Sequence, residues 1–265
     1  MAPPKKTSLP RTCTSTQRTT TMLPWIIVEA TQAHDGTELL LARRGSEWEV
    51  RADGHTLMSN RTHGSEMALA RLAFERVPEA KRVLVGGLGL GFTLRSTLDL
   101  LPPEGRLVLA ELSPDLVRWN RERVGDLAGH PLDDQRVEVA VGDVFDRIGE
   151  ARDRFDAILL DVDNGPEAFV HKTNERLYGD SGIRRCHEAL RVGGVLAVWS
   201  ASPDERYLRR LRSAAFDATA QWVRARAGGS RRHVVFIAAK MSTPARAQRK
   251  RPTRTSEARS RSGRF

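Results

Sequence analysis

The sequence predicts an α/β protein in which a small antiparallel β domain precedes a seven-stranded, mostly parallel sheet with an antiparallel terminal strand. Three observations support this prediction. From residue 82 onward, apolar runs alternate with helical spans, which is typical of a parallel sheet covered by helices on both faces. Residues 25–58 instead hold short β-rich runs broken by turn dipeptides, as in an antiparallel meander. The last two apolar runs are separated by a short Ala-Gly-Gly-Ser stretch, which predicts a hairpin and hence an antiparallel strand.

The first expected element is a β meander over residues 23–62. Its runs are WIIVEAT, TELLLARRG and EWEVRADG, and the breaks between and after them are Asp35-Gly36, Gly45-Ser46 and Asp53-Gly54. A helix is expected next, in GSEMALARLAFERV, where one face holds Met67, Leu69 or Ala70, Leu72 or Ala73, and Val77. Pro78 limits the end of that helix.

The parallel sheet is expected within a second domain, residues 63–240. Its strands should be, in order, RVLVGG, RLVLAEL, RVEVAVGD, FDAILLDVD, GGVLAVWS, the weaker TAQWVRAR, and RHVVFIAAK. In an open sheet of this kind, ligands bind outside the carboxyl ends of the strands. The residues that follow these strands are therefore the candidates for a functional site.

The net charge of +10 is concentrated in two tails. Residues 1–22 carry +4 and residues 241–265 carry +7, which leaves about −1 for the chain between them. Both tails lack apolar periodicity, so we expect them to be disordered. Their basic residues could make a weak contact with nucleic acid, although a solvated extension is the interpretation that we prefer. Met22 is an alternative start of the protein, because the first β-rich run follows it.

Composition argues against several protein classes. Only two cysteines occur, too few for a disulfide framework or a zinc knuckle. No apolar run approaches the roughly 18 to 20 residues that a membrane-spanning helix needs, and no secretory apolar segment is present. We therefore expect a cytoplasmic protein without membrane contact.

A glycine-rich loop follows the first parallel strand, with Gly87, Gly89 and Gly91. A dinucleotide-binding fingerprint starting at Gly87 would need glycine where the chain has Phe92, and the Gly-Lys-Ser/Thr of a P-loop is missing. What remains is a tight turn that lets a ligand approach bare backbone. A turn required only for packing is the simpler alternative.

Acidic residues follow each of the next three strands: Glu111, then Asp143, then Asp161 with Asp163. Glu111 comes twenty positions after Gly91, the spacing at which an acid receives a ribose diol. The loop has no basic residue for a pyrophosphate, and the acids would repel one. The predicted ligand is a cationic nucleoside without phosphates, as S-adenosylmethionine and decarboxylated S-adenosylmethionine are.

A metal pair formed by Asp161 and Asp163 is a weaker alternative. The two acids are two positions apart on one strand, so their side chains would point to the same face of the sheet. No histidine or further acid sits at ligand spacing beside them, so we expect no metal.

From about residue 25 to residue 240 the sequence resembles the spermidine synthase family, polyamine aminopropyltransferases with a Rossmann-like, class I methyltransferase sheet behind a small β domain. The glycine loop, LAELSPDLV, VGDVF, FDAILLDVDNGP and ALRVGGVLAVWS follow the order and spacing of the family. The resemblance implies that Glu111 holds the ribose, that Asp143 holds the adenine amine, and that Asp161 lies beside the reacting amine.

The sequence departs from the family pattern at the expected amine site. Leu90 stands where the glycine loop of the family has an aspartate that helps to bind the aminopropyl amine. Asn164 stands at the second aspartate of the Asp-Ser-Ser-Asp motif, and Asp163, one place earlier, is the candidate to replace it as a catalytic acid. Gly64 and Ser65 occupy the Tyr-His positions of a Tyr-His-Glu-Met helix start.

The expected activity is transfer of an aminopropyl group from decarboxylated S-adenosylmethionine to a small-molecule amine, with Asp161 as base or orienting group. The expected substrate-binding residues are Glu66, Asn164 and Tyr178, with helix packing as an equal alternative for Tyr178. Methyl transfer from intact S-adenosylmethionine is the second hypothesis, favoured by Leu90, and a non-catalytic nucleoside-binding or RNA-binding protein is the third. A homodimer is the expected assembly.

Overall fold

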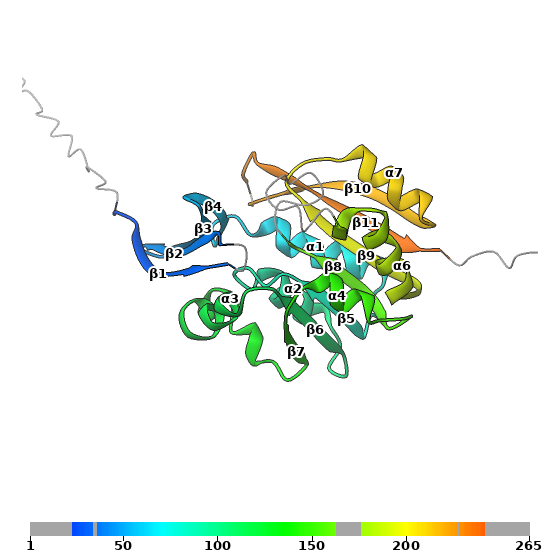
Figure 1. Ribbon diagram of the computed structural model, residues 1–265, viewed down its shortest axis with the longest axis horizontal. Coiled ribbons are helices and arrows are strands. Elements are labelled where there is room, and N and C mark those ends of the chain that lie inside the picture. Colours follow the sequence, from blue (N-terminus) through cyan, green and yellow to red (C-terminus); the bar gives the residue numbers. More distant parts are fainter. Residues whose placement is uncertain (1–22, 34–35, 163–175, 227, 242–265) are drawn as a thin grey trace, which may run out of the picture.

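The computed structural model describes residues 23–33, 36–162, 176–226 and 228–241, which form two β-sheets with helices packed on the larger one (Figure 1). The tails that we expect to be disordered lie outside the described residues, apart from Met241. Asp163 and Asn164 also lie outside them.

The small sheet is an antiparallel meander in the order β1-β2-β3-β4. Its strands are β1 (Ile26–Gln32), β2 (Glu38–Arg44), β3 (Glu47–Ala52) and β4 (His55–Ser59). The apolar runs predicted the first three strands but not β4. Its signal was the turn at Asp53 and Gly54, whose φ angles of 47° and 78° are those that a two-residue type I′ hairpin requires.

The large sheet has seven strands in the order β10-β11-β9-β8-β5-β6-β7. They are β5 (Arg82–Gly86), β6 (Arg106–Glu111), β7 (Val137–Val141), β8 (Phe155–Leu160), β9 (Leu190–Ser200), β10 (Phe216–Arg224) and β11 (Arg232–Lys240). Five neighbours, from β9 to β7, run parallel, and β11 pairs antiparallel with both β10 and β9. The predicted fold class is confirmed, with the antiparallel last strand lying one place inside the edge of the sheet.

Helices cover both faces of the large sheet, as the doubly apolar strands predicted (Figure 1). One core contains residues of α4 (Val144–Gly149), α6 (Asp180–Ala189) and α7 (Glu205–Ser213). The other contains residues of α1 (Gly64–Arg76), α2 (Phe92–Leu100) and α3 (Pro114–Trp119). Short η turns at Asn120–Val124, Gly125–Ala128 and Pro131–Asp133 follow α3.

Helix α1 buries most of the predicted face, but not Met67. Met67 is 47% exposed, whereas Leu69 and Leu72 are buried beside Ala70 and Phe74. The apolar stretch from Met67 to Ala70 spreads around the helix, so the sequence does not show which of its residues lies outside the buried face.

A third core joins the meander to the large sheet. Leu41 and Val50 of the meander pack in one cluster with Leu90 of the glycine loop and Trp119 of α3. At its rim Glu29 of β1 accepts hydrogen bonds from Arg118 at 2.6 Å, Trp119 at 2.8 Å and Arg123 at 2.5 Å. These hydrogen bonds, the one from Arg123 most of all, lower the pKa of Glu29 to about 2. The meander is thereby fixed over the glycine loop.

None of the helices in the described part of the chain is long and apolar enough to cross a membrane.

Candidate functional site

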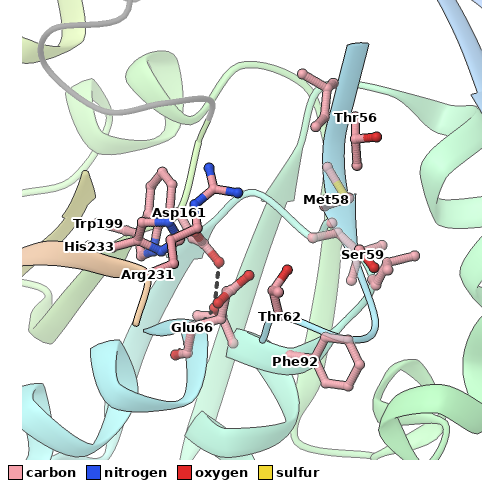
Figure 2. A pocket seen from close by; sticks show the side chains of 15 residues that line it. Thr56, Met58, Ser59, Thr62, Glu66, Phe92, Asp161, Trp199, Arg231 and His233 are labelled. Atoms are coloured by element: carbon pink, nitrogen blue, oxygen red, sulfur yellow. Dashed lines mark hydrogen bonds between the residues drawn. The ribbon is translucent and has the colours of Figure 1, made fainter. Parts of the chain in front are cut away.

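A cavity of about 180 Å³ lies between β4 and the carboxyl ends of the large-sheet strands β8 and β9 (Figure 2). The glycine loop, the first turns of α1 and α2, and the start of β11 complete its walls. The cavity therefore forms at the edge of the sheet where the sequence predicted a site, and the meander closes its open side.

Asp161 directly follows β8 and contributes a carboxyl group to the cavity. Its amide donates to the carbonyl of Gly86 at 2.8 Å, and its Oδ2 accepts a hydrogen bond from the hydroxyl of Thr93 at 2.5 Å. Burial and the nearby charge of Glu66 raise the pKa of Asp161 to about 7, against the bond from Thr93, which lowers it. Asp161 can therefore exchange a proton near neutral pH.

Glu66 lies in the first turn of α1 and turns its carboxyl toward the same cavity (Figure 2). Burial raises the pKa of Glu66, while the hydrogen bond that Ser65 donates to its Oε2 at 2.7 Å and the charge of Arg231 lower it. Two carboxyl groups that repel one another in a desolvated site do not ionise together readily. Glu66 and Asp161 therefore titrate as a pair.

His233 of β11 joins this group through Ser65, whose Oγ lies 2.9 Å from the Nδ1 of the imidazole. A hydroxyl has one proton, and Ser65 gives it to Glu66, so we assign the proton on Nδ1 to His233 as donor. Burial and the charge of Arg231 lower the pKa of His233 to about 4. The ring is therefore neutral at physiological pH.

Trp199, at the end of β9, packs edge-on against His233 with ring centroids 4.7 Å apart, and both residues line the cavity. Within the described residues, neither Nε1 of Trp199 nor Nε2 of His233 has a hydrogen-bond partner, although both atoms are buried. Orphaned polar atoms of this kind carry a free-energy cost. One wall of the cavity thus holds an unused donor beside an unused acceptor.

The glycine loop packs tightly between β8 and the meander. Gly87 has φ of +88°, and a Cβ there would lie 2.2 Å from the carbonyl oxygen of Asp161. Gly89 passes under β4, where a Cβ would lie 3.2 Å from the Sδ of Met58, and Gly91 caps α2. These contacts within the protein account for the glycines, and their contact with a cofactor stays a prediction.

Glu111 ends β6 and is buried. Its Oε2 accepts from the amide of Leu88 and its Oε1 from the amide of Ser113, each at 2.8 Å. These bonds hold the side chain in place beside the glycine loop. The predicted contact of Glu111 with a ribose is compatible with this geometry.

Asp143 caps α4 by accepting a hydrogen bond from the amide of Phe145 at 2.7 Å, and it forms an ion pair with Arg176. The carboxylate has a structural role in both contacts. Its predicted hydrogen bond with an adenine amine would have to share the oxygen atoms that these two groups already use.

Tyr178 lies in the core rather than among the residues that line the cavity. Its side chain is 3% exposed, its ring packs edge-on against Tyr207, and its hydroxyl donates to the carbonyl of Val162 at 3.0 Å. Packing is thus the alternative that these contacts favour. Through Val162, Tyr178 holds the chain immediately after Asp161.

The sequence patterns did not single out Thr93, Arg231 and His233, which line the cavity, or Ser65, which bonds to His233. Ser65 stood out only as a departure from a family motif. Thr93 belongs to no motif and lies near the start of the helix that follows the glycine loop. Arg231 and His233 flank the start of an apolar strand far from the acidic motifs. Their positions follow from the pairing of β11 with β9, which a single sequence does not reveal.

Among the residues that the structure describes, no group of three or more His, Cys, Asp or Glu side chains is gathered in a way that could hold a metal ion.

Comparison with known proteins agrees with these features. The model of the spermine/spermidine synthase domain matches residues 63–208. A polyamine aminopropyltransferase of Clostridium tetani is 29% identical over 126 residues, which cover 48% of this chain and 43% of that protein. Polyamine aminopropyltransferase 1 of Hyperthermus butylicus is 33% identical over 124 residues, 46% of this chain and 41% of that protein. The chain spans less than half the length of these curated relatives.

Solved structures show the same fold. The spermidine synthase of Thermotoga maritima superposes with a TM-score of 0.66 at 19% identity, over 81% of this chain and 72% of that one. A spermidine synthase crystallised with the transition-state analogue AdoDATO superposes equally well, with the same TM-score and coverage. Together with the domain match, which covers more than half of the sequence, these observations establish that the chain belongs to the spermine/spermidine synthase family.

Proposed function

We propose that this protein transfers an aminopropyl group from decarboxylated S-adenosylmethionine to an amine. One observation carries the proposal: Asp161, with a pKa of about 7, faces a cavity beside the glycine loop at the end of β8. A carboxylate with such a pKa can accept the proton that an attacking ammonium must lose. The relatives named polyamine aminopropyltransferase support the same reaction.

The proposed reaction is a single displacement at carbon. The donor supplies a sulfonium group, so that the bond from the reacting carbon to sulfur breaks as the bond to the amine nitrogen forms, and methylthioadenosine leaves with the electron pair on sulfur. The chain has to align the two molecules, and such alignment can lower the barrier by about 7 to 11 kcal/mol. Asp161 accepts the proton of the amine or orients its lone pair.

We assign the nucleoside to the side of the glycine loop away from β4. Glu111 would accept the ribose hydroxyls, Asp143 the adenine amine, and Gly87, Gly89 and Gly91 would provide a backbone surface for close approach. Glu111 is held for this purpose by the amides of Leu88 and Ser113.

We assign the amine acceptor to the cavity. Glu66 and Asp161 would face the amine, and Trp199 would form an aromatic wall. Asp163 and Asn164, which we also expect near the amine, lie outside the described residues, and the contacts of Tyr178 give it a positioning role.

The test is incubation of the full chain with decarboxylated S-adenosylmethionine and a panel of amines, with release of methylthioadenosine measured by chromatography. Asp161→Asn should reduce the rate by about 10² to 10⁴-fold, because a positioned proton acceptor usually accelerates a reaction by that factor. Asp99→Asn is the matched control, because Asp99 pairs with Arg95 on the exposed face of α2. Failure of every amine to release methylthioadenosine from folded protein would contradict the proposal.

Methyl transfer from intact S-adenosylmethionine is the second candidate, and Leu90 is the observation that favours it. Leu90 is buried among apolar residues of the meander, so the loop offers no carboxylate there for an aminopropyl amine. Calorimetry with the two donors separates the candidates, since tighter binding of intact S-adenosylmethionine would favour methyl transfer.

A further inference from the structure

Arg231 places a positive charge in the wall of a cavity that is expected to receive a cation. Its side chain lines the cavity with Glu66 and Asp161, and Figure 2 shows its guanidinium on the same side as Asp161. Its charge lowers the pKa values of both Glu66 and His233. The structure shows no hydrogen bond or ion pair between this guanidinium and any other described residue. Within the described part of the chain, no protein group therefore uses the guanidinium donors of Arg231.

The backbone holds Arg231 at this place. Its carbonyl accepts from the amide of Ala225 at 3.0 Å, which closes the hairpin between β10 and β11. The carbonyl of Ala225 in turn accepts from the amide of Gly64 at 2.8 Å, at the start of α1. A Cβ at Gly64 would lie 3.0 Å from the carbonyl oxygen of Arg224. Glycine, where the family motif has tyrosine, thus lets the hairpin bring Arg231 to the site.

The described wall of the cavity holds ionisable groups of both charge signs. Its ionisable groups are the carboxyl pair of Glu66 and Asp161, the guanidinium of Arg231, and the neutral imidazole of His233. Arg231 therefore places a fixed positive charge beside the two carboxyl groups of the cavity. A diamine has two ammonium groups with pKa values near about 10, and neither of them can accept a hydrogen bond from the guanidinium of Arg231.

We propose that the substrate in this cavity carries a carboxylate as well as an amine, and that Arg231 binds the carboxylate. The inference rests on the proposed function, because it names the class of molecule that the same site receives. A guanidinium presents planar paired donors that match a carboxylate, while Glu66 and Asp161 face the amine. The occupant is thus of the amino acid type rather than a simple diamine.

Two molecules of the reaction could bring that carboxylate. An acceptor such as a diamino acid has one, and so does intact S-adenosylmethionine, in contrast to its decarboxylated form. Arg231 and His233 both lie beyond residues 63–208, the segment that matches the family domain. The carboxylate site is therefore built from a part of this chain outside that domain.

The experiment compares two pairs of compounds that differ by one carboxylate, using calorimetry on the full chain. One pair is ornithine and putrescine, each titrated in the presence of methylthioadenosine; the other is S-adenosylmethionine and its decarboxylated form. The variants are Arg231→Gln and the control Arg232→Gln, whose exposed arginine on β11 does not line the cavity. In one of the two pairs, we expect the compound with the carboxylate to bind about 10- to 100-fold tighter. This is the gain in affinity that a hydrogen bond between charged groups provides. Arg231→Gln should abolish this preference, and Arg232→Gln should retain it.

The outcomes separate this inference from the proposed function. A preference for ornithine that depends on Arg231 supports both, whereas a preference for intact S-adenosylmethionine supports the carboxylate site and contradicts the proposed donor. Binding of decarboxylated S-adenosylmethionine and putrescine with no preference, or with one that survives Arg231→Gln, overturns the carboxylate site alone. If folded protein binds none of the four compounds, the proposed function is wrong, and this inference fails with it.

Discussion

The hydroxyl of Thr93 lies 2.5 Å from Oδ2 of Asp161, which joins the first turn of α2 to the residue that follows β8. Thr93 is buried, so water does not compete for this bond. Because α2 begins directly after the glycine loop, the loop and the acid are held as one unit. The bond favours the ionised form of Asp161 against the burial that favours its neutral form.

This relationship predicts the pH dependence of the reaction. Asp161 is protonated below about pH 7 and cannot then accept a proton, so kcat/KM should rise as pH increases through that value. Thr93→Val removes a bond that stabilises the carboxylate, and the midpoint should move to higher pH. Thr97→Val is the control, because the Thr97 hydroxyl is buried but bonds to the carbonyl of Thr93. Equal midpoints in all three proteins would show that Asp161 is not the titrating group.

The same raised pKa predicts an effect of opposite sign on stability. Between about pH 4 and pH 7 the folded state keeps a proton on Asp161 that the unfolded chain has released, so stability should fall as pH rises through this window. Asp161→Asn removes the free-energy cost of burying an ionised carboxylate. The free energy of unfolding of this variant at pH 8 should therefore exceed that of the wild type by about 1 to 3 kcal/mol. Urea denaturation at pH 4 and pH 8 tests this, since the difference should be present at pH 8 only.

The lowered pKa of Glu29 predicts the opposite dependence of stability on pH. Its pKa is lowered to about 2 by Arg123, Arg118 and Trp119, so its contribution to stability is present above the unfolded pKa near 4 and is lost as pH falls toward 2. Glu29→Gln should reduce the free energy of unfolding at pH 7 by about 1 to 2 kcal/mol, allowing for partial exposure. Glu75→Gln breaks only an exposed pair with Arg71 and should change it by less than about 0.5 kcal/mol. Similar losses in both variants would argue against a specific role of Glu29.

Gly87 and Gly54 form a matched pair for the glycine loop. Both have positive φ, +88° and +78°, but a Cβ at Gly54 meets nothing within 4 Å, whereas one at Gly87 meets the carbonyl oxygen of Asp161 at 2.2 Å. Gly54→Ala should cost only backbone strain, about 1 to 2 kcal/mol. Gly87→Ala should cost several kcal/mol in total and displace Asp161, as measured by urea denaturation and by loss of activity. Equal losses of stability and activity in the two variants would mean that a clash with the carbonyl of Asp161 does not determine the cost of Gly87→Ala.

Leu90→Asp restores the acid that the family has in this loop, and we expect it to damage the protein. Leu90 is 4% exposed and packs with Leu41 and Trp119, so the variant loses apolar packing and buries an unpaired charge. The free energy of unfolding should fall by about 3 kcal/mol or more. Leu100→Asp, at a position that is 40% exposed, should be tolerated. A stable Leu90→Asp variant with improved binding of decarboxylated S-adenosylmethionine would contradict the packing role of Leu90.

The sequence predicted which acidic residues stand at the strand ends. Glu111 and Asp161 directly end or follow β6 and β8, and hydrophobic runs locate such ends well. It did not predict contacts made by distant partners: Ser65 and His233 are 168 positions apart, and their bond depends on the pairing of β11. β4 was also missed, because three of its five residues are exposed and leave no alternating apolar pattern.

The placement of β11 also constrains the order of events during synthesis. This strand comes last among the described strands, yet it lies between β10 and β9, so β10 has no neighbour in the sheet until β11 inserts. A chain emerging from the ribosome folds its earlier segments first, and it can assemble β5 to β9 with their helices before β11 exists. Arg231 and His233 would then arrive last. Under the proposed function, the residues assigned to the nucleoside, Glu111 and Asp143, would be in place before this wall of the cavity forms.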